Sequence, residues 1–168
     1  MEQTVVRRFI YPALLTPPPS LSFSDQFAFR PTGSPTAAII TLLHTITNLL
    51  TTNPYVIVIL LDFSKPLGTV RHSTLLEKLA QLDIPDNVYN WFVNFFSGHS
   101  HCTQYSGQTS MLKDITASII QGSAIGPAAY VVNAGDLAAV TPGNQLCKFA
   151  DDTYLIVPAS SEIGRAHV

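Results

Sequence analysis

Residues 146–157 read LCKFADDTYLIV, two apolar runs with an acidic doublet between them. Runs of β-branched, aromatic and aliphatic residues favour strands, and a short polar dipeptide between two such runs favours a turn. The stretch therefore predicts a β-hairpin with the carboxylates of Asp151 and Asp152 at its tip. From spacing alone, the alternative is an ordinary acidic turn with no chemical role, because such turns are common.

A second acidic residue follows the longest apolar run of the chain, YVIVILL over residues 55–61. A continuous aliphatic run of this kind is typical of a strand that is buried on both faces. Asp62 stands at the point where this strand would leave the sheet. A carboxylate there is costly unless it is solvated, paired or bound to a cation. The simpler alternative is that Asp62 only terminates the strand.

If these strands are neighbours in one sheet, the carboxylates of Asp62, Asp151 and Asp152 converge at its edge. Three like charges that meet require a counterion. Carboxylate oxygens suit Mg²⁺, which keeps water ligands and recruits substrate phosphates. Two such ions can activate an attacking hydroxyl and stabilise a leaving pyrophosphate. The residues therefore predict metal-assisted phosphoryl or nucleotidyl transfer.

Helical periodicity accounts for most of the remaining apolar residues. Ser34 is a predicted N-cap with Pro35 in the first turn, and residues 53–54 end that helix. Residues 85–86 separate a leucine-marked helix from an amphipathic aromatic one, and a further helix is predicted over 126–140. The aromatic stripe is interpreted as core packing. Its members are Val88, Trp91, Phe92, Phe95 and Phe96.

Three other segments carry weaker signals. Residues 99–121 are polar and contain the turn dipeptide Ser106-Gly107, which predicts short strands or a hairpin. Residues 1–24 include three consecutive prolines at 17–19 and predict an irregular N-terminal segment. Residues 158–168 form a tail that does not look native. The folded domain is therefore expected over residues 25–157.

The composition sets limits on what the chain can be. Its 168 residues suit one domain or a piece of a larger one, and 46 % of them are apolar, enough for a sizeable core. Nine Lys and Arg stand against eleven Asp and Glu, so no basic surplus indicates a nucleic-acid partner. Cys102 and Cys147 have no spacing typical of zinc sites or disulfide frameworks. No apolar run approaches the length of a membrane span, and secretion is not expected.

Four blocks of sequence, in this order, resemble the reverse transcriptases of non-LTR (LINE-type) retrotransposons. The blocks are QFAFRP over residues 26–31, LDFSK over 61–65, QGSAIGP over 121–127 and FADD over 149–152. The resemblance spans roughly residues 20–157. It implies an α+β fold, namely a right-hand polymerase palm (an antiparallel sheet with packed helices) plus part of the fingers, truncated. The start of the fingers and the thumb would lie outside this chain.

The resemblance also implies an activity, RNA-directed DNA polymerisation, with an RNA template, a DNA primer and dNTP as partners and no membrane. Asp62, Asp151 and Asp152 match the family's catalytic, metal-binding aspartates, which hold two Mg²⁺ ions. The carbonyl of Phe63 is a further expected metal ligand. An intracellular location, in cytoplasm and nucleus, is implied by the family.

Four further residues match positions that the family places near the nucleotide or the template. Gln121 and Gly122 match the block that lies against the incoming nucleotide and template. Leu67 takes the place of an aromatic residue that excludes the ribose 2′-hydroxyl. Arg30 falls in a fingers segment where it would meet phosphate, and an exposed charge on a loop is the alternative.

The chain departs from the family directly after Asp62, where FSKPLG replaces the usual FSKAFD. Pro66 removes a backbone N–H from a turn that, in the family, lies under the triphosphate. Leu67 puts sugar discrimination in doubt, and Gly68 replaces a carboxylate and loosens the turn. The alternative function is therefore a catalytically inactive, truncated remnant of a retrotransposon polymerase.

Overall fold

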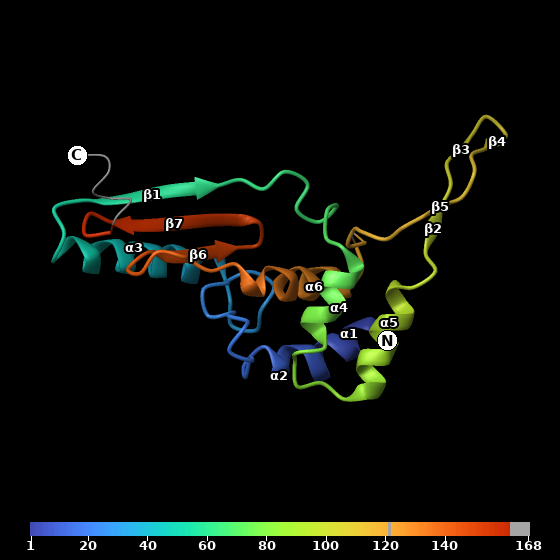
Figure 1. Cartoon of the computed structure of the whole chain (residues 1–168), viewed down its shortest axis with the longest axis horizontal. Coiled ribbons are helices and arrows are strands. Elements are labelled where there is room, and N and C mark those ends of the chain that lie inside the picture. The colour runs from blue at the N-terminus through green and yellow to red at the C-terminus, as the bar shows by residue number, and fades with distance from the viewer. Residues whose placement is uncertain (121, 162–168) are drawn as a thin grey trace. The chain divides into compact units, whose positions relative to one another are not determined.

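The computed structural model describes residues 1–120 and 122–161 (Figure 1). The chain forms two compact units, each built from two separate stretches of sequence. The first unit contains Met1–Thr16 and Lys65–Asn133, and the second contains Pro17–Ser64 and Ala134–Val168. Helices and antiparallel strands occur in both units, so the expected mixture of helix and antiparallel sheet is confirmed.

The second unit is built on a three-stranded sheet with the order β1-β7-β6. Its strands are β1 (Val56–Leu61), β6 (Gln145–Phe149) and β7 (Asp152–Pro158), and both pairings are antiparallel. The β6–β7 hairpin is therefore confirmed where the sequence predicted it. The register pairs Phe149 with Asp152 across the hairpin, and Leu61 of β1 with Thr153 of β7.

β1 does not occupy the position that its sequence predicted. The apolar run indicated a strand buried on both faces, but β1 lies at the edge of the described sheet. Val58, Ile59 and Leu60 are 39 %, 38 % and 55 % exposed. An apolar run shows that a strand can be buried, whereas its actual burial depends on how many strands and helices surround it.

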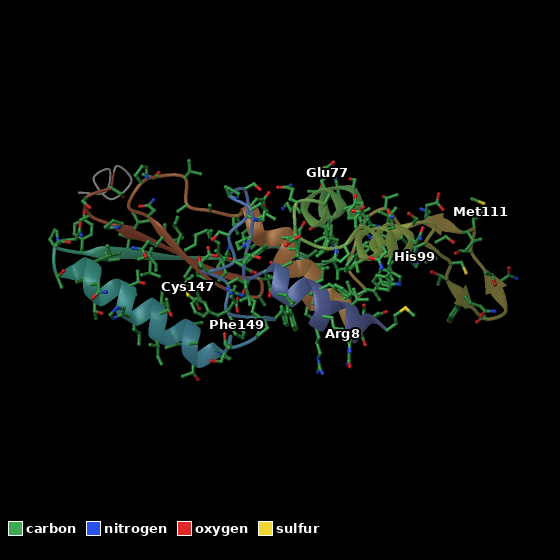
Figure 2. The ribbon with its side chains drawn as sticks, turned by 90° about the horizontal axis from the view of Figure 1, so that it is seen from below. Arg8, Glu77, His99, Met111, Cys147 and Phe149 are labelled. Carbon is green, nitrogen blue, oxygen red and sulfur yellow. The ribbon has the colours of Figure 1, made fainter. Side chains whose placement is uncertain are left out.

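Helix α3 (Pro35–Leu50) runs along one face of this sheet (Figure 1). The Ser34 side chain accepts a hydrogen bond from the Ala37 N–H at 3.1 Å, which confirms the predicted N-cap. Buried Ala38 packs against Cys147 of β6 and Ile156 of β7. Cys147 and Phe149, both labelled in Figure 2, come from β6. Partly buried side chains extend this cluster: Phe27, Leu42, Ile46, Leu49, Val56, Phe149 and Tyr154.

The first unit has a core formed by helices. Its longer helices are α4 (His72–Leu79), α5 (Asp86–Phe96) and α6 (Ile125–Asn133). Fully buried side chains come from all three, including Leu75, Phe92 and Val132. On α5, Val88, Phe92 and Phe96 are buried and Trp91 and Phe95 are partly buried, so the aromatic stripe is core packing, as predicted.

The segment between α5 and α6 forms two short antiparallel ladders. Strands β2 (Ser100–His101) and β5 (Lys113–Asp114) pair, and between them β3 (Gln104–Tyr105) pairs with β4 (Gln108–Thr109). Ser106 and Gly107 have φ angles of 47° and 75°, as a tight two-residue hairpin turn requires. The predicted short strands and turn signal are therefore confirmed.

Two predicted segments differ from the structure. Residues 1–24 were expected to be irregular, but α1 (Glu2–Val5), a π-helical turn η1 (Val6–Ile10) and α2 (Tyr11–Ala13) form a helical stretch. Its apolar residues Val6, Ile10, Ala13 and Leu14 recur at helical spacing and are buried, which stabilises the helix ahead of the prolines.

The predicted helix over 126–140 is shorter than expected. α6 ends at Asn133 and is followed by a 3₁₀ turn, η2 (Ala134–Asp136), that contains Gly135. In the tail, Pro158 still belongs to β7, while residues 162–168 lie outside those that the structure describes. Among the described helices, none is both long enough and apolar enough to cross a bilayer.

Candidate active site

The acidic doublet lies in a tight turn between β6 and β7. β6 ends at Phe149, and Ala150 and Asp151 make the turn before β7 begins at Asp152. The side chains of Asp151 and Asp152 are exposed. Ala150 has a φ of 56°, a left-handed conformation that costs a non-glycine residue about 1–2 kcal/mol. Neighbouring groups must therefore stabilise this turn.

Asp62 stands at the same end of the sheet. It is the first residue after β1, and the register continued by one position sets it opposite Asp152. Asp62 is also exposed. The strand pairing therefore confirms that the two acidic segments of the sequence belong to one sheet and lie on adjacent strands.

The three carboxylates nevertheless do not converge on one point. Among residues 1–120 and 122–161, no three His, Cys, Asp or Glu side chains are grouped closely enough to hold a metal ion. The sequence predicted convergence, but exposed like charges repel each other and are stabilised by turning towards water. Their donor chemistry and shared sheet end fit a hard divalent cation, since exposed carboxylate oxygens are the ligands that such ions take.

A buried glutamine from the first sequence block contacts the acidic turn directly. Gln26 is 3 % exposed, and its Oε1 accepts hydrogen bonds from the N–H groups of Ala150 (3.1 Å) and Ala28 (3.0 Å). Its Nε2 donates to the Ala150 carbonyl at 3.3 Å. Sequence reasoning used Gln26 only as part of a block and assigned it no role, because its partner lies 124 positions away.

A buried lysine holds the same block against β6. The N–H of Lys148 donates to the Asp25 carbonyl at 2.7 Å, and the Phe27 N–H donates to the Lys148 carbonyl at 2.8 Å. Lys148 is 1 % exposed, and its Nζ lies 3.1 Å from Asp25 Oδ1. Nζ also donates to the carbonyls of Ala134 (3.2 Å) and Leu137 (2.9 Å). These contacts compensate the buried charge.

Arg30 is not the exposed charge on a loop that was the alternative prediction. It is half-buried, and its Nη1 donates to the backbone carbonyls of Phe23 and Gln26, the latter at 3.2 Å. Burial lowers the pKa of the guanidinium, and the nearby charge of Asp25 opposes that shift. In this structure Arg30 stabilises its own loop, and contact with phosphate stays a prediction.

The remaining predicted residues are divided between the units. Phe63, 38 % exposed, follows Asp62 in the second unit. Leu67 belongs to the first unit, where it is partly buried and its carbonyl accepts a hydrogen bond from the Ile119 N–H at 2.9 Å. Gly122, also in the first unit, is exposed with a φ of 88°. Gln121 lies outside the described residues.

Ser123 and Ala124, which follow Gly122 in the first unit, have a hydrogen-bond partner that the sequence did not reveal. Glu2 Oε2 accepts hydrogen bonds from the Ser123 hydroxyl and the Ala124 N–H, both at 2.9 Å. A carboxylate next to the first turn of α6 is favourable, because the N-terminus of a helix carries a partial positive charge. Glu2 therefore stabilises the segment that joins Gly122 to α6.

Two comparisons with known proteins find matches to this chain. Residues 4–168 match the family model described as reverse transcriptase (RNA-dependent DNA polymerase). The chain is also 29 % identical, over 114 residues, to an RNA-directed DNA polymerase from the mobile element jockey of Drosophila melanogaster. That alignment covers 64 % of this chain but only 12 % of the fly protein. On the family match, which extends over nearly its whole length, the chain belongs to the reverse transcriptase family.

Proposed function

We propose that this chain is part of the RNA-directed DNA polymerase of a non-LTR retrotransposon. The observation that carries the proposal is the pairing of β1 with β7, which brings Asp62 beside the acidic turn. The similarity to the jockey polymerase supports the same assignment. In this proposal the sheet of the second unit with α3 is part of the palm, and the chain also contains part of the fingers.

The proposed reaction is nucleotidyl transfer from dNTP to the 3′-hydroxyl of a DNA primer on an RNA template. The hydroxyl attacks the α-phosphorus, and pyrophosphate leaves. Asp62, Asp151 and Asp152 would hold two Mg²⁺ ions, with the Phe63 carbonyl as a further ligand. Such ions supply charge neutralisation and Lewis acidity at the transferred phosphate.

Four further residues would bind the substrates in this proposal. In the proposal Gln121 and Gly122 lie against the incoming nucleotide and template. Leu67 would contact the sugar of the incoming nucleotide. Arg30 would meet phosphate through guanidinium donors other than Nη1. Because nucleotides and template RNA are found inside the cell, the proposal carries an intracellular location, in cytoplasm and nucleus.

A catalytically inactive remnant of such a polymerase is the second candidate, and one turn favours it. Lys65 has a φ of 53°, and its carbonyl accepts hydrogen bonds from the N–H groups of Gly68 (3.0 Å) and Thr69 (3.2 Å). Pro66 inside this turn has no N–H to offer a phosphate. These hydrogen bonds are internal to the turn, which directly follows the segment that carries Asp62.

Primer extension on an RNA template with Mg²⁺ tests the proposal. The chain is compared with Asp151→Asn and with the matched control Asp83→Asn, which neutralises an exposed aspartate between α4 and α5. Extension by the unchanged chain and by the control, with a loss of about 10²-fold or more in Asp151→Asn, supports the polymerase. Equal extension by all three proteins refutes the assigned site. No extension by any of them favours the inactive remnant.

A further inference from the structure

The backbone of the acidic turn is held by a side chain from the other end of the sequence. The amide of Gln26 contacts Ala150 at two points: Oε1 accepts from the Ala150 N–H at 3.1 Å, and Nε2 donates to the Ala150 carbonyl at 3.3 Å. These atoms belong to the two peptide groups on either side of Ala150. The second of these groups also contains the N–H of Asp151, so the amide of Gln26 restrains the direction in which the doublet begins.

The turn requires such support because its own residues do not favour it. A two-residue hairpin turn with a positive φ at its first residue favours glycine there, whereas this turn reads Ala150-Asp151. Ala150 has a φ of 56° without being glycine or asparagine. The hydrogen bonds from Gln26 therefore offset a conformational cost that local sequence leaves in place.

Gln26 is itself held firmly. Gln26 forms a parallel bridge to Lys148, whose N–H donates to the Asp25 carbonyl at 2.7 Å and whose carbonyl accepts from the Phe27 N–H at 2.8 Å. The carbonyl of Gln26 accepts from Arg30 Nη1 at 3.2 Å. The side chain is 3 % exposed, so little rotational freedom is left to lose when it bonds to the turn.

We infer that Gln26 is a positioning residue for the carboxylates of Asp151 and Asp152, acting through the backbone of Ala150. This inference rests on the proposed function, because positioning matters only if these carboxylates bind a cation. Side chains that orient metal ligands through hydrogen bonds, without binding the metal themselves, typically contribute 10–100-fold to metal affinity. Gln26→Leu removes both contacts with Ala150 while keeping a side chain of similar volume.

A matched control lies in the same unit. Asn53 is 9 % exposed, its Nδ2 donates to the Leu49 carbonyl at 2.9 Å, and its Oδ1 accepts from the Ser160 N–H at 3.0 Å. Ser160 follows β7, at the end opposite the acidic turn. Asn53→Leu therefore removes the same type of buried side-chain to backbone contact without touching the turn.

The experiment measures Mn²⁺ affinity from the electron paramagnetic resonance signal of the free ion, for the full chain and the variants Gln26→Leu, Asn53→Leu and Asp151→Asn. Amide hydrogen exchange at residues 150–152 is measured in parallel without metal. We expect Gln26→Leu to weaken Mn²⁺ binding about tenfold and to speed exchange at 150–152. Asn53→Leu should change neither, although it lowers the melting temperature.

The outcomes separate the two proposals. If Asp151→Asn binds Mn²⁺ as the unchanged chain does, the assigned metal site and the proposed function fail, whatever Gln26 does. If Asp151→Asn loses affinity while Gln26→Leu matches Asn53→Leu, only the role of Gln26 is overturned. Unchanged exchange at residues 150–152 in Gln26→Leu overturns that role independently of any metal.

Discussion

Replacing Lys148 with methionine would remove a buried ammonium group from the second unit while keeping an unbranched side chain. The Lys148 Nζ lies 2.9 Å from the Leu137 carbonyl, 3.2 Å from the Ala134 carbonyl and 3.1 Å from Asp25 Oδ1. Asp25 Oδ1 is buried and forms no hydrogen bond among the described residues, so this ammonium group compensates its charge. Methionine would remove the Nζ donor from all three oxygens, and the Ala134 carbonyl would keep its hydrogen bond from the Leu137 N–H at 3.2 Å.

The expected loss of unfolding free energy depends on which member of the ion pair stays buried. Removing one member of a buried ion pair costs about 3–5 kcal/mol, because the other charge stays buried without compensation. The side chain of Asp25 is 21 % exposed and can regain some hydration, which places the expected loss near the lower value, about 3 kcal/mol. For a chain of this length, that corresponds to a fall in melting temperature of about 6–12 °C.

Circular dichroism during urea and thermal unfolding measures this loss. Lys113→Met, at an exposed lysine of β5, is the control and should stay within about 0.5 kcal/mol of the unchanged chain. Adding Asp25→Asn to Lys148→Met should restore about 1 kcal/mol, because the uncompensated charge is then removed. A loss below about 1 kcal/mol in Lys148→Met, or no coupling with Asp25→Asn, would refute this account of the buried charge.

Two further predictions concern packing and pH. A Cβ added in Gly135→Ala would lie 2.5 Å from Cε1 of the buried Phe23 ring, so we expect a loss of about 1–3 kcal/mol in urea unfolding. Gly68→Ala, whose nearest neighbouring atoms are at 3.7 Å, should be nearly neutral, and equal midpoints for the two variants would contradict the packing argument. Burial, with the charge of Asp25, raises the pKa of the Cys147 thiol. Stability should therefore fall as the pH rises above about 8.5, where the unfolded thiol ionises and the folded one does not. Cys147→Ala should flatten that fall between about pH 8 and 10, and an unchanged slope would show that another group causes it.

The candidate site was predictable where its signals were local. Two apolar runs around an acidic dipeptide predict the turn that carries Asp151 and Asp152. The end of a third apolar run identifies Asp62. That these segments share a sheet was a hypothesis which the pairing of β1 with β7 confirmed. The role of Gln26 could not be read from the sequence, because an amide in a loop has no pattern that identifies its partner.

The sequence by itself determined where the longer helices and the strands lie, although it did not predict the helical stretch over residues 2–13. Caps such as Ser34, the aromatic stripe of α5 and the hairpin turns act over a few residues, so their effect on the backbone can be read locally. Only the tertiary structure decided that β1 lies at an edge and that Gln26 bonds to a residue 124 positions away. Burial and long-range hydrogen bonds depend on which other elements pack nearby, and a single segment does not carry that information.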